Sequence, residues 1–190
     1  MRIKDELKQE AIIQATIKLV NNIGFASSSV AKIAKEANVS PATIYIYYKN
    51  KEDLLVSTYL NIKHQMGIAM LKDFNEGKPI RDIFRTFWLN SFDFISKKPE
   101  FFYYAEQFVN SPYSDLVNKS AVEKYFEPIL MTIQKGIDQQ IIKDVSIDML
   151  SAFIFHPIVV LANPRKNSDI KLNKKTIETA FQLAWDAIKL

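Results

Sequence analysis

The chain has 190 residues, enough for one or two domains with a proper core, and it contains no cysteine, which excludes a disulfide framework and thiolate metal sites. Its net charge is +4, and its first residues are charged with no apolar stretch, so we expect no secretory signal peptide. The longest apolar run, residues 149–162, is too short to span a bilayer, and we therefore expect a cytoplasmic protein without a membrane partner.

Helical periodicity and few glycines predict an all-α chain of about nine helices. The positive charge is not spread evenly. Residues 1–63 carry nine Lys and Arg against six Asp and Glu, whereas residues 64–190 carry sixteen against fifteen. The excess lies mostly in the first third of the chain, where it would suit a phosphate backbone.

The first predicted helix covers residues 4–23 and has one apolar face. Gly24 ends it as the residue after the C-cap, and Phe25 packs beneath. A second helix follows, capped by Ser29, whose hydroxyl accepts from an otherwise unpaired amide of the first turn. Asn38 closes this helix, since asparagine tolerates a left-handed backbone better than most residues.

The next helix runs from Pro41 to about Tyr48 and buries Ile44. Ser40 caps it, and Pro41 takes the first position, where a missing N–H costs nothing. Its outward face is small and aromatic, and residues 49–51, Lys-Asn-Lys, follow at once. This layout favours a helix-turn-helix whose second helix enters the DNA major groove. The alternative is an ordinary αα-hairpin with solvated lysines.

Residues 33–55, I-A-K-E-A-N-V-S-P-A-T-I-Y-I-Y-Y-K-N-K-E-D-L-L, closely resemble the DNA-binding signature of the tetracycline-repressor (TetR) family of bacterial transcriptional regulators. With a sparser match back to about residue 7, the resemblance covers roughly the first third of the chain. It implies a helix-turn-helix domain over 1–50, with the motif at about 29–48. An effector-binding and dimerisation domain over 51–190 would begin with a connecting helix at 51–74.

Four positions depart from the commonest family pattern. Asn38 and Ala42 stand where Gly is usual or frequent, Tyr48 where Phe is usual, and Ala31 where a polar or basic residue is often found. The first three are conservative in shape. The last removes a possible base or phosphate contact and so affects the sequence preference.

We expect a ligand-responsive regulator, a repressor rather than the alternative activator, that leaves a pseudo-palindromic operator in double-stranded DNA when a small effector binds. Ala42 and the Thr43 methyl group would touch thymine methyls, while Tyr45, Tyr47 and Lys51 would hold phosphates. The expected DNA-binding residues are Ser28, Ser29, Ser40, Pro41, Ala42, Thr43, Tyr45, Tyr47 and Lys51.

After the connecting helix, helices are expected at 79–96, 99–110, 114–140, 146–163 and 174–189, with a polar loop at 163–173. Pro128 should kink or split the third of these, and Asn173 should cap the last. Aromatic residues gather in the middle of this region. Such stripes are often plain core, but the resemblance implies a cavity for a hydrophobic, aromatic or cationic effector. The expected effector contacts are Trp88, Phe92, Tyr103, Tyr104, Glu106, Gln107, Phe126 and His156.

The last two expected helices carry more apolar residues than a small monomer needs. They either close the core or, as the resemblance implies, form a four-helix bundle with a second copy in a homodimer. A two-fold dimer also suits DNA half-sites that lie about one helical turn, or a multiple of it, apart. The expected interface residues are Phe153, Ile154, Ile158, Phe181, Trp185 and Ile188.

Enzymatic function is not expected. The two histidines are far apart in sequence, and neither a glycine-rich phosphate loop nor an HExxH motif occurs, so we expect neither a metal nor a cofactor. Two other classes stay open as alternatives. One is a helical adaptor that binds protein instead of DNA, which a salt-insensitive partner would reveal. The other is an all-α enzyme whose catalytic residues converge from distant segments.

Overall fold

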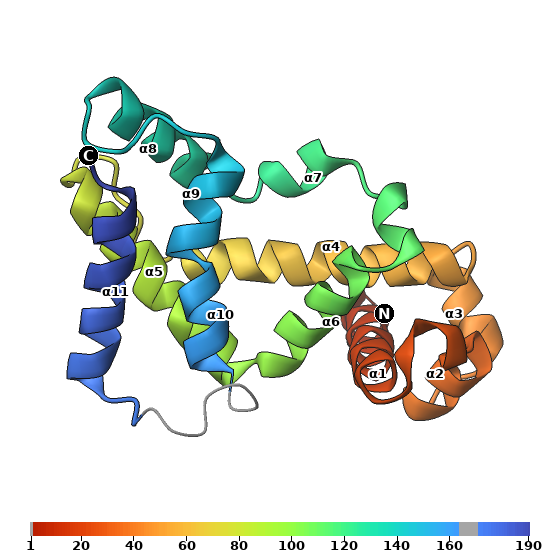
Figure 1. Cartoon of the computed structure of the whole chain (residues 1–190). Coiled ribbons are helices and arrows are strands. Elements are labelled where there is room, and N and C mark those ends of the chain that lie inside the picture. Colours follow the sequence, from red (N-terminus) through yellow and green to blue (C-terminus); the bar gives the residue numbers. More distant parts are fainter. Residues whose placement is uncertain (1, 164–170) are drawn as a thin grey trace. The chain divides into compact units, whose positions relative to one another are not determined.

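The computed structural model describes residues 2–163 and 171–190, and every named element in these residues is a helix (Figure 1). The expected all-α class is therefore confirmed. Most of the polar loop expected at 163–173 lies outside the described residues. None of the described helices combines the length and the apolar character needed to cross a bilayer.

The chain packs as two compact units, which we call the head unit (residues 2–64 and 100–121) and the body unit (residues 65–99 and 122–190, as far as described). The head unit contains α1 (Arg2–Ser27), α2 (Val30–Glu36), α3 (Pro41–Tyr47), the first part of α4 (Lys51–Met70), nearly all of α6 (Pro99–Val109), the short 3-10 helix η1 (Pro112–Leu116) and the start of α7 (Lys119–Glu123).

The first four helices of the head unit share one small core. Each helix turns one apolar face toward this core. The buried members are Ile12, Ala15, Ile33, Ala34, Ile44, Tyr48 and Leu54. Burial raises the pKa of Tyr48 to about 12, so its phenol stays neutral in this core.

A second, aromatic part of the head core joins α1 to α6. Gly24 has φ +75°, which interrupts α1 as expected and sends Phe25 inward. The Phe25 ring lies edge-on to Tyr104 and Phe108, with centroids 5.4 and 6.0 Å apart. Tyr59 of α4 stacks on Phe108 at 4.3 Å. Residues far apart in sequence therefore complete a single core.

The body unit contains the end of α4, α5 (Ile80–Lys97), α8 (Glu127–Asp138), α9 (Ile147–Ile154), α10 (His156–Ala162) and α11 (Lys174–Ile188). Trp88 of α5 lies at its centre and is fully buried. The indole N–H donates to the Ile154 carbonyl at 2.9 Å, and Phe181 meets the ring edge-on at 6.0 Å. Asn173 caps α11 as expected, with a reciprocal hydrogen bond from its own N–H to Thr176.

Two prolines divide helices that the sequence pattern predicted as single elements. Pro128 lies in the first turn of α8, so α8 is separate from α7 within the expected helix at 114–140; a further break lies between η1 and α7. Pro157 likewise lies in the first turn of α10, and Phe155 separates α9 from α10 within the expected helix at 146–163. A proline lacks the N–H that a helix interior needs, whereas the first turn tolerates it. The break at Pro128 was expected and the one at Pro157 was missed.

Candidate DNA-binding surface

The α2–turn–α3 segment has the local geometry expected of a helix-turn-helix. Ser29 accepts from Lys32 N at 3.3 Å and Ser40 accepts from Thr43 N at 3.1 Å, so both serines are N-caps. Asn38 has φ +54° and closes α2 in the left-handed region, which confirms its role. These local contacts fix where α3 begins and which of its faces is buried.

Helix α3 turns Ile44 into the core and leaves an uncharged face in solvent. Tyr45 is 56% exposed and Ile46 is 76% exposed, and Ala42 is exposed one turn before Ile46. Ile46 was absent from the expected DNA-binding residues. Its i, i+4 relation to Ala42 was the signal that could have found it, because both residues then share one face. A large apolar side chain in this position has no neighbour in the head core to cover it.

Ser28 does not belong to the DNA-facing surface. Its side chain is fully buried, and its hydroxyl donates to the Gly24 carbonyl at 2.7 Å. The hydroxyl therefore satisfies a carbonyl at the interrupted end of α1 and does not reach solvent. We remove it from the set of residues proposed to contact phosphate.

Lys51 has a structural contact that the sequence did not suggest. Its ammonium group donates to the Phe25 carbonyl at 2.7 Å, and so ties the start of α4 to the end of α1. A cation near the last carbonyls of a helix is favoured by the helix dipole. By contrast, the Lys49 side chain is exposed shortly after the end of α3.

The start of α4 has its own side-chain cap. Asp53 N donates to Asn50 Oδ1 at 2.8 Å, and Lys49 N donates to Asp53 Oδ2 at 2.8 Å. The expected cap at Asn50 is confirmed. Together these bonds fix the path of the chain from α3 into α4, so that the lysines flanking the turn have defined positions.

Tyr47, at the C-terminal end of α3, is linked to the start of α1. Its hydroxyl donates to Asp5 Oδ1 at 2.6 Å, across 42 positions of sequence. The hydrogen bond to the carboxylate raises the pKa of Tyr47, with smaller contributions from burial and from the Asp5 charge. Asp5 is exposed, and Tyr47 is half-buried beside Tyr48.

Several residues expected to contact an effector belong to the core instead. Trp88 is fully buried with its N–H bonded, and Phe92 stacks on it at 5.8 Å. Tyr104 is also fully buried, and its hydroxyl donates to the Leu55 carbonyl at 2.9 Å. Buried polar groups that already have partners stabilise a fold and offer nothing to a ligand.

The other expected effector residues are more accessible, and they divide between the two units. In the head unit, Tyr103 is half-buried and Glu106 is exposed, while the Gln107 amide donates to Asn21 Oδ1 at 3.1 Å. In the body unit, Phe126 is half-buried next to α8 and His156 is exposed on α10.

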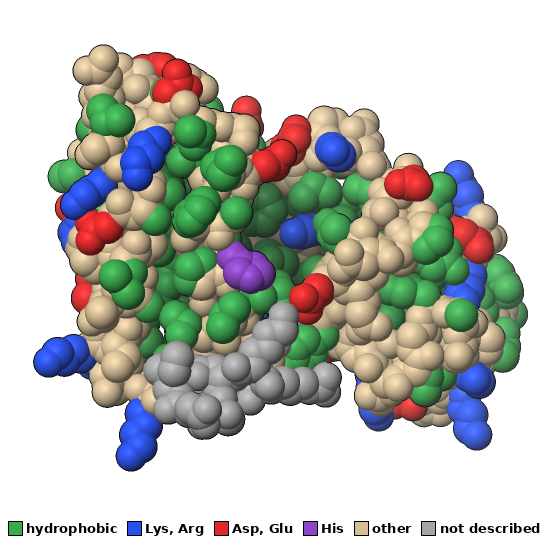
Figure 2. All heavy atoms as spheres, in the orientation of Figure 1, with side chains coloured by type: hydrophobic (Ala, Val, Ile, Leu, Met, Phe, Trp, Pro, Cys, Tyr) green, Lys and Arg blue, Asp and Glu red, His purple; other side chains and the backbone are tan. Residues whose placement is uncertain are grey.

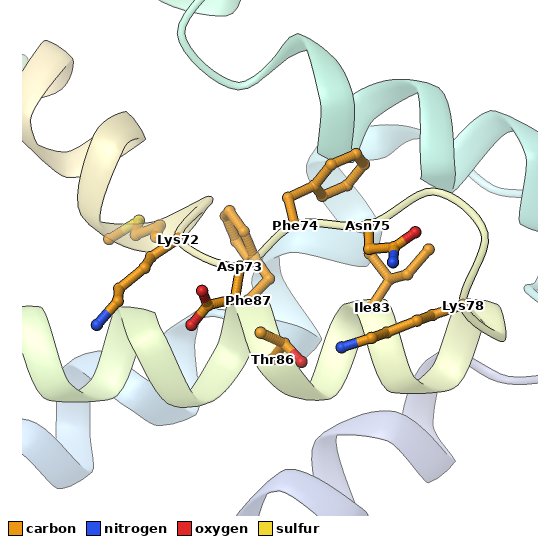
Figure 3. A pocket seen from close by; sticks show the side chains of 9 residues that line it. Lys72, Asp73, Phe74, Asn75, Lys78, Ile83, Thr86 and Phe87 are labelled. Carbon is orange, nitrogen blue, oxygen red and sulfur yellow. The ribbon is translucent and has the colours of Figure 1, made fainter.

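One small pocket of the body unit lies between α5 and the turn after α4 (Figure 3). Its volume of about 10 Å³ has room for about one water molecule, so it is too small for an organic effector. The lining residues are Met70, Lys72, Asp73, Phe74, Asn75, Lys78, Ile83, Thr86 and Phe87.

The expected dimer-interface residues mostly face inward. All but one of the six are buried within the chain, each at most 4% exposed: Ile154, Ile158, Phe181, Trp185 and Ile188. Phe153 is the exception at 54%. Trp185, for example, lies 5.5 Å from the Phe84 ring. These helices therefore do close the core of their own chain.

The opposite faces of the same helices form an apolar groove of about 460 Å³ (Figure 2). Leu183 at its edge is 68% exposed, and Val160 is 36% exposed. His156 is the one lining residue that can carry a charge. We call this surface the α9–α11 face; its lining residues are Ala152, Phe153, His156, Pro157, Val160, Leu161, Ala180, Leu183, Ala184 and Ala187.

Comparison with protein families gives two matches that together span most of the chain. A model of bacterial regulatory proteins of the tetR family matches residues 12–58, which include α2, α3 and the start of α4. A model of the tetracyclin repressor-like C-terminal domain matches residues 79–189, more than half of the chain.

Individual relatives agree with the family models. A crystal structure of a TetR family transcription regulator from Marinobacter aquaeolei is 34% identical, covers 100% of this chain and 99% of that one, and has a TM-score of 0.90. An HTH-type transcriptional regulator of Haemophilus influenzae is 28% identical over 180 residues, 95% of each chain. The fatty acid metabolism regulator protein of Bacillus subtilis is 45% identical over 60 residues, which are 32% of this chain and 29% of that protein.

Proposed function

Because the chain belongs to the TetR family of DNA-binding transcriptional regulators, whose members are not enzymes, we propose that it is a repressor that binds a pseudo-palindromic operator as a homodimer. A small effector would release it, and it would act in the cytoplasm, where bacterial DNA lies. The observation that carries the proposal is the exposed, uncharged face of α3 directly before the exposed Lys49.

This face favours reading by shape and methyl contacts. Ala42, Ile46 and the Thr43 methyl group would contact the C5-methyl groups of thymine in the major groove. Tyr45 and Lys49, which are both exposed, would hold phosphates beside them. The face has no Arg, Asn or Gln for bidentate bonds to base edges, so thymine methyls should account for much of the discrimination.

A duplex selected by the full chain from a random-sequence pool supplies the probe. Replacing contacted thymines by deoxyuridine removes only the C5-methyl, and each lost contact should lower affinity about fourfold, since a buried methylene is worth about 0.8 kcal/mol. The loss of affinity caused by deoxyuridine should be smaller in Ile46→Ala than in the wild type. Deoxyuridine in the flanks is the control. Equal affinity for both duplexes would refute the proposed reading.

The α9–α11 face supports the homodimer. Exposed Phe153, Val160 and Leu183 make an apolar surface on the family's C-terminal domain, and large exposed apolar patches mark interaction sites. A second copy would bury this face without disturbing the buried residues behind it. We therefore place the proposed interface on these exposed residues.

Sedimentation velocity tests the interface. Leu183→Asp should convert a dimer at micromolar concentration into a monomer, because dimerisation would bury the new charge. Val109→Asp, at a residue 57% exposed in the head unit, is the matched control and should leave the dimer intact. A wild-type monomer, or equal behaviour of the two variants, would overturn this part of the proposal.

For the effector we propose a hydrophobic, aromatic or cationic molecule. Support comes from Tyr103 and Glu106 of α6, which are accessible to solvent. Trp88 and Tyr104 are buried, and we no longer include them among the proposed effector contacts. The match to the fatty acid regulator covers the DNA-binding part and so does not bear on the effector. Tetraphenylphosphonium is a suitable probe, with decanoate as the anionic comparison. The cation should raise the melting temperature and weaken operator binding, and Tyr103→Ala should reduce both effects. No change in operator affinity would count against it.

A further inference from the structure

Asp5 and Tyr47 make a contact that the proposed function does not require. The Tyr47 hydroxyl donates to Asp5 Oδ1 at 2.6 Å, a length typical of a strong bond to a carboxylate. Asp5 is exposed near the start of α1, and Tyr47 ends α3 next to the exposed Lys49. A carboxylate thus lies at the edge of the surface proposed to meet the DNA backbone.

A phenol has one proton to donate. In the free chain the Tyr47 hydroxyl uses that proton to donate a hydrogen bond to Asp5. A phosphate oxygen that approaches the same hydroxyl can accept only if this bond breaks. The phosphate also brings a second negative charge to a carboxylate that stays within a few ångströms, and like charges at that separation repel. Both effects oppose the phosphate contact.

We propose that Asp5 competes with DNA phosphate for the Tyr47 hydroxyl and so lowers the affinity of the head unit for DNA of every sequence. Like the surface it acts on, this inference rests on the proposed function. Phosphate contacts carry no sequence information, so Asp5 weakens operator and non-specific binding together. Asp5 would thus keep the regulator readily dissociable without changing which sequence it prefers.

Asp5→Asn tests the competition, because the amide is nearly isosteric with the carboxylate and lacks its charge. Affinity for the selected duplex should rise about five- to tenfold at low salt, and affinity for an unrelated duplex should rise by the same factor. The slope of log affinity against log salt should steepen by up to about one, because Asp5→Asn removes one negative charge beside the phosphates.

Glu10→Gln is the matched control. It removes one negative charge from the same helix, at an exposed residue that is bonded to Gln14 and not to Tyr47. The affinity of Glu10→Gln for either duplex should rise less than twofold. In a Tyr47→Phe background, where no hydroxyl is left to compete for, the gain from Asp5→Asn should be clearly smaller than in the wild type.

Equal gains from Asp5→Asn and Glu10→Gln would overturn the inference, and so would a loss of affinity in Asp5→Asn, since that would make Asp5 a support for Tyr47. A carbon-13 titration of labelled tyrosine in the DNA-free protein gives an independent reading. The Tyr47 pKa should fall toward its ordinary value in Asp5→Asn and stay raised in Glu10→Gln. If the wild type selects no duplex from the random-sequence pool, the proposed function fails. The titration still reports on the contact between Asp5 and Tyr47.

Discussion

Lys51 distinguishes a residue that touches DNA from one that holds the head unit together. In Lys51→Met the aliphatic part of the side chain remains, but the ammonium donor to the Phe25 carbonyl is lost. That carbonyl still accepts a longer hydrogen bond from Ser28 N, at 3.3 Å. A hydrogen bond to a charged group contributes about 1.5–3 kcal/mol. With one bond retained and Lys51 partly exposed, we expect a loss of about 1–1.5 kcal/mol.

A loss of this size lowers the melting temperature by about 2–6 °C for a chain of this length. Thermal unfolding followed by circular dichroism measures it, and hydrogen–deuterium exchange should show faster exchange in peptides that cover residues 24–30. Lys49→Met is the control, because it removes the same charge from an exposed side chain beside α3. Lys49→Met should weaken DNA binding with little change in stability. The reasoning fails if both variants unfold at the same temperature as the wild type.

Three further predictions concern the body unit. Gly67→Ala should destabilise by about 1–3 kcal/mol in chemical denaturation, because the new Cβ would lie 2.7 Å from the Tyr125 carbonyl oxygen, a clash that the helix propensity of alanine does not offset. Trp88→Phe should lower the melting temperature by about 5–10 °C, since it opens a void and leaves a buried carbonyl of α9 unpaired; an unchanged value would mean that Trp88 is not core. The Arg85 hydrogen bond lowers the pKa of Glu178, so this pair stabilises above about pH 4.3 and the gain is lost as the pH falls through the lowered pKa. Arg85→Met should therefore flatten the acid side of the stability–pH profile, by at most about 1 kcal/mol because the pair is 42% exposed.

Much of the head unit could be predicted because its signals are local. A cap such as Ser40, or a left-handed closing residue such as Asn38, acts within four residues of its own position. The side-chain orientations of Ser28 and Lys51 could not be predicted in the same way. Their partners are carbonyls at the interrupted end of α1, and a serine or lysine in a turn has the same sequence pattern whether it faces DNA or the chain.

The body unit was harder to predict because its helices are apolar on more than one side. In α9, Ile154 is buried while its neighbour Phe153 is exposed, and the sequence pattern alone did not distinguish an inward from an outward face. Tertiary packing decides this, as it does for Trp88 in the same unit and for Tyr104 in the head unit. The expected effector and interface residues were therefore drawn largely from the core, whereas the DNA-binding surface needed only local correction.

The aromatic contacts of Phe25 have a practical consequence for building chimaeric regulators. A fragment that ends at residue 64 would keep Phe25 and Tyr59 but lose Phe108, the ring that both of them pack against. Such a fragment would expose an apolar surface and tend to aggregate. Exchange of DNA specificity between relatives therefore calls for either two grafted segments, residues 2–64 and 100–121, or a graft confined to the solvent face of α3.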